Sequence, residues 1–152
     1  MMASRRYAPS LDRLLRLYSR NYRNLSRLLA RARRVNGEVA QYRWQHAQQA
    51  LILQLTVNEQ TRYTEVVTVE RLAPPLPLVA PARIEIRLYH DALMAEVLTG
   101  QHFLRLLPAY PYPNARMQQR DEKFQVNLFL AELLEQFAHR EWQLISAREE
   151  SR

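Results

Sequence analysis

The spacing between apolar residues changes near Val39, and this change constrains the fold more than any other feature of the sequence. Between Ser10 and Arg34, leucines and tyrosines recur every three or four residues, which predicts one long amphipathic helix. Ser10 is a suitable N-cap, and Asn36 followed by Gly37 is a typical helix stop. The residues expected on the apolar face are Leu11, Leu14, Leu15, Tyr18, Tyr22, Leu25 and Leu29.

After Val39, apolar and polar residues alternate with a period of two, which predicts β-strands. The alternating runs are short and are separated by polar turns, so successive strands should pair antiparallel. The sequence therefore predicts an antiparallel sheet of five to six strands. These strands are expected at residues 39–46, 51–58, 61–71, 83–89, 92–98 and 101–107.

A second amphipathic helix is predicted near the C-terminal end, because its apolar residues again recur at spacings of three and one. Two such helices can cover one face of the sheet, which gives an α+β fold. The length of 152 residues fits a single domain spanning 1–152, with flexible ends at 1–9 and 147–152. The stripe of this helix consists of Val126, Phe129, Leu130, Leu133, Leu134 and Phe137.

The basic charge is concentrated in one segment. The formal net charge is +7, but residues 1–34 hold ten arginines and one acid, whereas residues 35–152 hold twelve basic and fourteen acidic side chains. Most of these arginines fall within a band about 80° wide opposite the leucines of the first helix. A solvated face is the simplest explanation, and contact with nucleic acid, an acidic protein or anionic lipid headgroups is the functional alternative. We call this band the arginine face; it consists of Arg13, Arg16, Arg20, Arg23, Arg27, Arg31 and Arg34.

Missing residue types exclude several classes of function. The sequence has no cysteine, which excludes disulfides, thiolate zinc sites and cysteine nucleophiles. Its two glycines are too few for a glycine-rich phosphate loop. We therefore assign no catalytic residue, metal ligand or cofactor. No run approaches the ~20 apolar residues of a membrane span and no secretory signal is present, so we expect a cytoplasmic protein; the arginine-rich start leaves a mitochondrial presequence as an alternative.

The segment RLYHDA, at residues 87–92, places polar side chains around a predicted hairpin turn. If His90 and Asp91 form the tip, Arg87, Tyr89 and Glu96 could gather near them. A histidine beside an aspartate can act as an acid–base pair, although the other histidines are not spaced as metal ligands. The structural alternative is that Asp91 closes the turn and Arg87 pairs with an acidic residue across the strands.

A second polar segment, QRDEK at residues 119–123, lies at the entrance of the closing helix. In the structural interpretation, Asp121 is favoured by the positive end of the helix and the basic residues are solvated. In the functional interpretation, Arg120, Lys123 and Asn127 lie within about 60° of one another, off the apolar stripe. Three such donors could hold a phosphate or a carboxylate.

Tyrosines alternate with prolines immediately before this helix, at residues 110–113. Such a stretch is a rigid approach to the helix, with Asn114 as its cap. Exposed tyrosines between prolines, such as Tyr112, also suit a binding surface.

Three blocks of the sequence resemble one bacterial family. They are Thr61 with Tyr63 and Thr64, RLYHDALMAEV at residues 87–97, and YPYPNARMQQRDEKFQVNLFL at residues 110–130. Together they are similar to the YqiB-like proteins, a bacterial family of unknown function, over residues 7–137. The resemblance implies a small cytoplasmic bacterial protein without an assigned activity, cofactor or catalytic residue. The arginine face is not part of that family pattern.

Three functions remain open at this point. The favoured hypothesis is a non-enzymatic binding or regulatory module whose polar patch combines RLYHDA, the tyrosine–proline loop and QRDEK. The second is an enzyme acting on a nucleotide or phosphate ester, with His90 and Asp91 as acid–base pair and Arg87, Arg120 and Lys123 as phosphate contacts. The third is binding of nucleic acid or a membrane surface through the arginine face. We expect the partner to be another protein or a small anionic ligand, and the oligomeric state is left open.

Overall fold

The computed structural model describes residues 11–72, 83–98, 115–138 and 141–146, without the side chains of residues 115–121. Each helix and strand in this part of the chain matches a pattern in the sequence except the last strand, which was not expected. The elements are, in order, α1 (Leu11–Asn36), β1 (Gln41–His46), β2 (Ile52–Gln60), β3 (Thr64–Leu72), β4 (Arg83–Tyr89), β5 (Met94–Val97), α3 (Ala115–Phe137) and β6 (Trp142–Leu144).

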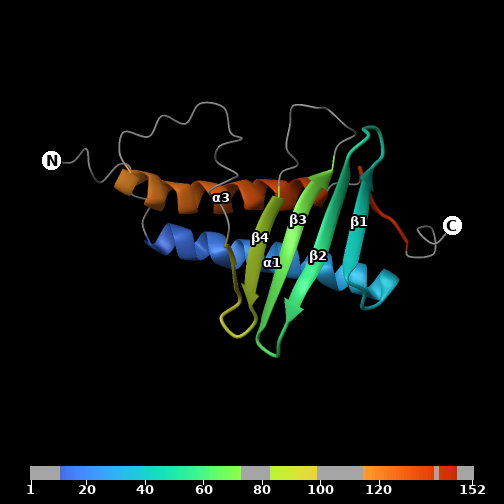
Figure 1. Ribbon diagram of the computed structural model, residues 1–152, viewed down its shortest axis with the longest axis horizontal. Coiled ribbons are helices and arrows are strands. Elements are labelled where there is room, and N and C mark those ends of the chain that lie inside the picture. The colour runs from blue at the N-terminus through green and yellow to red at the C-terminus, as the bar shows by residue number, and fades with distance from the viewer. Residues whose placement is uncertain (1–10, 73–82, 99–114, 139–140, 147–152) are drawn as a thin grey trace.

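The strands form one antiparallel sheet in the order β5-β4-β3-β2-β1-β6. Strands β1 to β5 pair with their neighbours along the chain, whereas β6 follows α3 and pairs with β1. Helices α1 and α3 lie side by side on one face of this sheet and run in the same direction (Figure 1). The predicted α+β fold, with both helices packed on one face, is therefore confirmed.

Helix α1 ends where the sequence indicates. Gly37 adopts a φ of +75°, and its N–H donates to the carbonyl of Arg33 at 2.8 Å, which closes the last turn. The buried stripe differs from the predicted one. Leu11, which was expected to begin the apolar face, is 69% exposed. The buried residues of α1 are Leu17, Tyr18, Asn21, Leu25, Leu29 and Ala32.

The core lies between the helices and the inner face of the sheet. Side chains alternate along each strand, so Ile84, Ile86 and Leu88 of β4 point toward the helices and are buried. The predicted stripe of α3 meets them, with Phe129 partly buried at its margin. Its buried members are Val126, Leu130, Leu133, Leu134 and Phe137.

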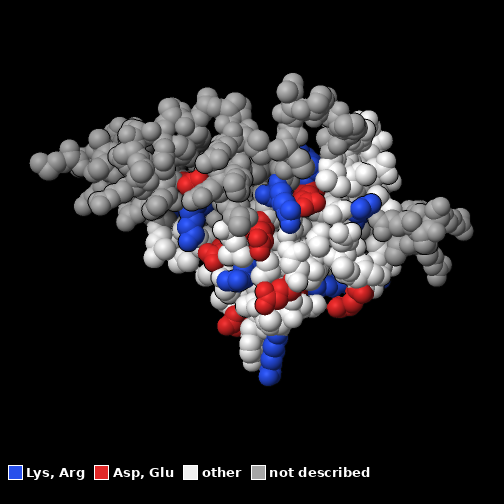
Figure 2. All heavy atoms as spheres, in the orientation of Figure 1, with Lys and Arg blue, Asp and Glu red and all other residues white. Residues whose placement is uncertain are grey.

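The other face of the sheet, which neither helix covers, is polar. The register places Arg87 of β4 directly opposite Glu96 of β5 and Tyr89 opposite Met94 on this face. Figure 2, in the orientation of Figure 1, shows acidic and basic side chains interspersed where the strands lie. This face therefore carries mixed charge.

Strand β6 was not predicted from the sequence. It places Trp142 beside His46 at the end of β1, with ring centroids 5.0 Å apart in an edge-to-face contact. His46 Nε2 lies 3.1 Å from Glu141 Oε2, and its Nδ1 accepts the backbone N–H groups of Gln48 and Gln49. This histidine thus organises the turn after β1. The predicted strand at 101–107 and the ends at 1–9 and 147–152 lie outside the described residues.

Candidate functional site

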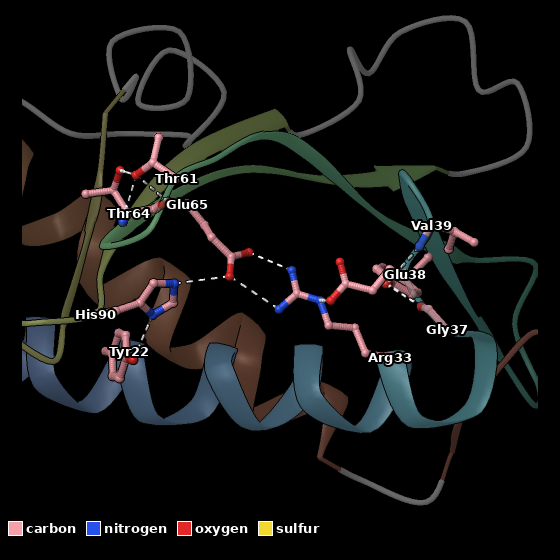
Figure 3. A network of polar contacts seen from close by, with 10 residues as sticks. Tyr22, Arg33, Gly37, Glu38, Val39, Thr61, Thr64, Glu65 and His90 are labelled. Carbon is pink, nitrogen blue, oxygen red and sulfur yellow. Dashed lines mark hydrogen bonds and ion pairs between the residues drawn. The ribbon is translucent and has the colours of Figure 1, made fainter.

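His90 is held between α1 and β3. Its Nδ1 lies 2.9 Å from the hydroxyl of Tyr22, and its Nε2 lies 3.1 Å from Oε1 of Glu65. The histidine and tyrosine rings also meet edge to face, with centroids 5.7 Å apart. Figure 3 shows the resulting row of contacts, which runs from Tyr22 through His90 and Glu65 to Arg33. Asp91, the next residue in the turn, is exposed.

The partners of His90 indicate which ring nitrogen carries the proton. Glu65 accepts hydrogen bonds from both terminal nitrogens of Arg33, at 3.3 and 2.7 Å, so it also serves as the acceptor for an Nε2–H group. In a neutral ring, Nδ1 then accepts the hydroxyl proton of Tyr22. Burial, followed by the charge of Glu65, raises the pKa of Tyr22. A tyrosine that retains its proton is a hydrogen-bond donor here and not an activated nucleophile.

The ion pair of Arg33 and Glu65 is largely removed from water, with side-chain exposures of 22% and 4%. Its hydrogen bonds raise the pKa of the guanidinium, an effect that burial opposes. Glu38 adds a longer contact, with Oε1 3.9 Å from Nε of Arg33. Because Arg33 belongs to α1 and Glu65 to β3, the pair fastens the helix to the sheet.

A second polar group centres on Glu96 of the edge strand β5. The hydroxyl of Tyr89 donates to Oε1 of Glu96 at 2.7 Å, and Nζ of Lys123 lies 3.9 Å from Oε2. Burial and the hydrogen bond to Glu96 are the main causes that raise the pKa of Tyr89. The structure therefore brings Lys123 of α3 to Glu96, which also accepts from Tyr89 and lies opposite Arg87. The ring of His90 instead contacts Tyr22 of α1.

Asn127 is fully buried and holds the edge of the sheet. Its Oδ1 accepts the backbone N–H of Val97 at 3.0 Å, and its Nδ2 donates to the carbonyl of Lys123 at 2.7 Å. The side chain of Asn21 donates to the carbonyl of Asn127 at 2.9 Å, which links α1 to α3. These contacts account for the polar groups of the Asn127 side chain inside the core.

The arginine face is exposed along its whole length. Arg13 lies over the ring of Phe124, 5.3 Å from its centroid, and Arg20 forms an ion pair with Glu135. No carboxylate of the described residues lies within ion-pair distance of the other five members. These unpaired members are Arg16, Arg23, Arg27, Arg31 and Arg34.

A groove of about 430 Å³ runs between the C-terminal halves of α1 and α3. Arg27, Arg31 and Arg34 line it on the α1 side. Its α3 side includes Leu134 and Phe137, so the groove combines charged walls with apolar lining. We call it the interhelical groove.

A second groove, of about 350 Å³, separates α1 from the turn between β4 and β5. Arg27 and Arg23 line it together with Tyr22 and Leu93. Leu93 has a φ of 57°, a conformation that costs a leucine roughly 1–2 kcal/mol, and its side chain is 58% exposed. Leu93, which directly follows RLYHDA, thus lines this groove together with Arg23 and Arg27 of the arginine face.

Four candidate residues fall outside what the structure describes. Tyr112 and Asn114 precede the start of α3, and the side chains of Arg120 and Asp121 belong to the segment 115–121. Of QRDEK, the structure describes the side chains of Glu122 and Lys123, and Lys123 contacts Glu96 of β5 and not a residue of RLYHDA. For the undescribed residues, the binding role stays a prediction.

Two further observations concern metals and membranes. Within the described ranges, no group of three or more histidine, aspartate or glutamate side chains is arranged to hold a metal ion. Neither α1 nor the described α3 contains an apolar stretch that could span a bilayer.

Residues 24–142 match the model of a family described as a protein of unknown function (DUF1249). The chain belongs to this family. It is 42% identical over 130 residues to the uncharacterised protein YqiB of Escherichia coli K12, covering 86% of this chain and 89% of that protein. The YqiB proteins of Escherichia coli O6:H1 and O157:H7 show the same values. No solved structure matches.

Membership of DUF1249 agrees with the resemblance read from the three sequence blocks. The family match begins at Asn24, inside α1. Arg27, Arg31 and Arg34 of the arginine face therefore lie within the matched region, whereas its four earlier members precede it.

Sequence reasoning missed the two partners of His90, which are Tyr22 and Glu65, and the ion pair that Glu65 forms with Arg33. One signal was available for Glu65, because it occupies a position that the alternation of β3 assigns to the core, in line with Val67 and Val69. A charged residue at such a position needs a buried partner. The identity of that partner depends on how α1 crosses the sheet, which the sequence pattern does not specify.

Proposed function

We propose that this protein is a non-enzymatic binding module that contacts an anionic partner through the arginine face of α1. The observation that carries the proposal is that five exposed arginines on one helix face have no ion-pair partner among the described residues. Guanidinium groups bind carboxylates and phosphates in a planar, two-pronged geometry. A cytoplasmic location, expected from the sequence, belongs to the same proposal.

Repulsion between the arginines of α1 supports the proposal that this face binds an anionic partner. Six pairs of neighbouring arginines stand three or four residues apart. At ~0.2–0.5 kcal/mol each, their repulsion opposes the helix by roughly 1–3 kcal/mol before screening by salt. Burial of leucines such as Leu25 and Leu29 outweighs this cost, so the helix forms. An anionic partner would remove the repulsion when it binds.

Catalysis by His90 and Asp91 has weaker support. An acid–base group must reach the proton that it transfers. Both nitrogens of His90 are engaged by Tyr22 and Glu65, and the raised pKa of Tyr22 disfavours a nucleophilic role for that hydroxyl. The enzyme hypothesis would require this network to open.

The polar residues around Glu96 are a second candidate binding surface. Tyr89 and Lys123 both contact Glu96, which lies opposite Arg87 in the register of β4 and β5, and these four residues belong to the polar patch proposed from the sequence. The carboxylate of Glu96 already balances the charge of Lys123. We therefore rank this patch below the arginine face as an anion site.

The test is equilibrium binding of the full chain to two fluorescein-labelled polyanions, a 20-residue poly-L-glutamate and a 20-nucleotide oligo-dT. We expect binding that weakens with salt. If five arginines each contact one phosphate, a rise from 50 to 200 mM salt lowers the oligo-dT affinity about a hundredfold.

The matched variants are Arg27→Gln with Arg31→Gln and Arg62→Gln with Arg83→Gln. Both pairs remove two exposed charges, but only the first pair lies on the arginine face. We expect the first pair to weaken binding and the second to leave it unchanged. Binding of neither polyanion, or equal effects of the two pairs, would contradict the proposal.

A further inference from the structure

We infer that the interhelical groove binds an acidic, amphipathic helix of a partner protein. The inference rests on the proposed anion-binding function and narrows it to one class of partner. The groove, about 430 Å³ in volume, is within the range that holds several side chains of a ligand. A groove between two helices is also a common docking place for a third.

The charge around the groove is positive. Arg27, Arg31 and Arg34 line it and have no ion-pair partner among the described residues. Glu135 also lines it, but this carboxylate is paired with Arg20. Three unbalanced positive charges therefore remain, and they favour a partner with carboxylates along one side.

The spacing of these arginines suits a helix. They stand four and three residues apart, so their Cα atoms follow one another at about one helical turn, ~5.4 Å, along α1. Carboxylates at positions i, i+4 and i+7 of a second helix have the same spacing. Two helices laid alongside each other can therefore form three charged contacts in register.

The lining of the groove favours a protein over a nucleic acid. Leu28, Ala30 and Ala138 supply aliphatic surface, which suits leucine-like side chains of a partner. Sequence-tolerant binding of single strands relies on exposed aromatic rings on which bases stack. Among the described residues, the one aromatic side chain lining this groove is Phe137, which is only 3% exposed and packs edge to face against Trp142, with ring centroids 4.6 Å apart.

The test is selection of a phage-displayed library of random 16-residue peptides on the immobilised full chain. We expect enrichment of peptides in which Asp or Glu recurs every three or four residues beside leucine or phenylalanine. The charge reversals Arg27→Glu and Arg31→Glu should abolish this enrichment. The matched reversals Arg62→Glu and Arg83→Glu, outside the groove, should preserve it, and thermal melting should show that both variants are folded.

The most enriched peptide is then measured by fluorescence anisotropy. Replacing its acidic residues by glutamine, or its apolar residues by serine, should each weaken binding about tenfold or more. The inference would be overturned if the same peptides are enriched on the variant with the two groove reversals. It would also be overturned if the serine replacements leave the affinity of the peptide unchanged.

Two other outcomes separate the inference from the function on which it rests. If oligo-dT binds and depends on Arg27 and Arg31 while no acidic peptide is enriched, the partner is a nucleic acid and the inference fails alone. If neither peptides nor polyanions bind, the inference and the proposed function fail together.

Discussion

His90 and Glu65 lie in contact, with Nε2 3.1 Å from Oε1, although 25 residues separate them in the chain. The contact fixes the turn after β4 against β3, and the hydrogen bond of His90 to Tyr22 extends it to α1. Arg33, in the last turns of α1, contacts Glu65 and completes the connection. The polar residues that most resemble a catalytic group thus connect α1 to the sheet beneath the arginine face.

Truncating either member of the Arg33–Glu65 pair to alanine should lower the free energy of unfolding, and the two losses should differ in size. Arg33→Ala leaves Glu65, only 4% exposed, without its main counter-charge, and should lower the free energy of unfolding by about 3–5 kcal/mol. Glu65→Ala leaves a guanidinium that is 22% exposed and better solvated, so we expect a smaller loss of about 2–3 kcal/mol. Urea denaturation of both variants measures the difference.

The surface pair of Glu70 and Arg83 is the control for that measurement. Its arginine side chain is 70% exposed, so Glu70→Ala should cost less than about 1 kcal/mol. A loss of similar size at the two pairs would mean that the contact of Arg33 with Glu65 does not fasten α1 to the sheet.

Tyr18 should make stability fall at alkaline pH. Burial is the main cause that raises its pKa to about 12, so the folded chain keeps a proton that the unfolded chain loses near its ordinary pKa of 10. Its stabilising contribution is complete below pH 10 and disappears as the pH rises through 12. Between pH 10 and pH 12, the free energy of unfolding should therefore fall by about 2–3 kcal/mol less in Tyr18→Phe than in the unsubstituted protein.

The same substitution should be tolerated at neutral pH. The Tyr18 hydroxyl is buried and has no hydrogen-bond partner among the described residues, so Tyr18→Phe should raise stability by about 1 kcal/mol. Tyr63→Phe, at a side chain that is 54% exposed, is the control and should change neither quantity. Destabilisation by Tyr18→Phe at pH 7 would show that the hydroxyl is hydrogen-bonded in solution.

Asn127 should stabilise β5, the strand at the edge of the sheet. Asn127→Ala leaves the N–H of Val97 buried without its acceptor, which should cost about 1–3 kcal/mol. Hydrogen exchange of the Val97 amide should accelerate more than that of core amides such as Ile86, because the loss is local. Unchanged exchange at Val97 would contradict the assigned hydrogen bond.

Two residues in the left-handed region should respond in opposite directions. Gly37→Ala meets no atom within 4 Å but forces alanine to a φ of +75°, which should cost about 1 kcal/mol. Leu93→Asn places a residue that tolerates this region at a φ of 57° and should raise stability by roughly 0.5–1 kcal/mol. Differential scanning calorimetry of both variants measures the shifts, and a loss at Leu93→Asn would indicate that its exposed side chain supports the fold.

Neutralising part of the arginine face should stabilise the free protein. Arg27→Gln with Arg31→Gln removes three like-charge pairs of α1, so the free energy of unfolding should rise by about 1 kcal/mol at low salt. The gain should shrink as salt screens the repulsion. Arg62→Gln with Arg83→Gln should show no such gain. Destabilisation by the first pair at low salt would mean that these arginines already have partners within the chain.

The parts of the fold that follow from local periodicity were predictable. The alternation in β4 and the Gly37 stop of α1 each depend on a few neighbouring residues, and both elements form as expected. Strand β6 was missed because three residues are too few for a periodic signal, and Trp142 is identified as a strand residue only by its pairing with His46.

The candidate site was less predictable, because its residues meet across long stretches of chain. Lys123 joins Glu96 only through the packing of α3 against β5. The partners of His90, Tyr22 and Glu65, depend on the angle at which α1 crosses the sheet. Periodicity identifies the face of an element that is buried and gives no information on which buried faces meet.

The most direct test of the anion-binding account is a two-dimensional ¹⁵N NMR titration of the full chain with the 20-residue poly-L-glutamate. The account predicts that shifts concentrate on the α1 residues around Arg27 and Arg31 and on Leu134 across the interhelical groove. Shifts confined to the strand residues around Arg87 and Glu96, with α1 unchanged, would contradict it and favour the polar patch around Glu96.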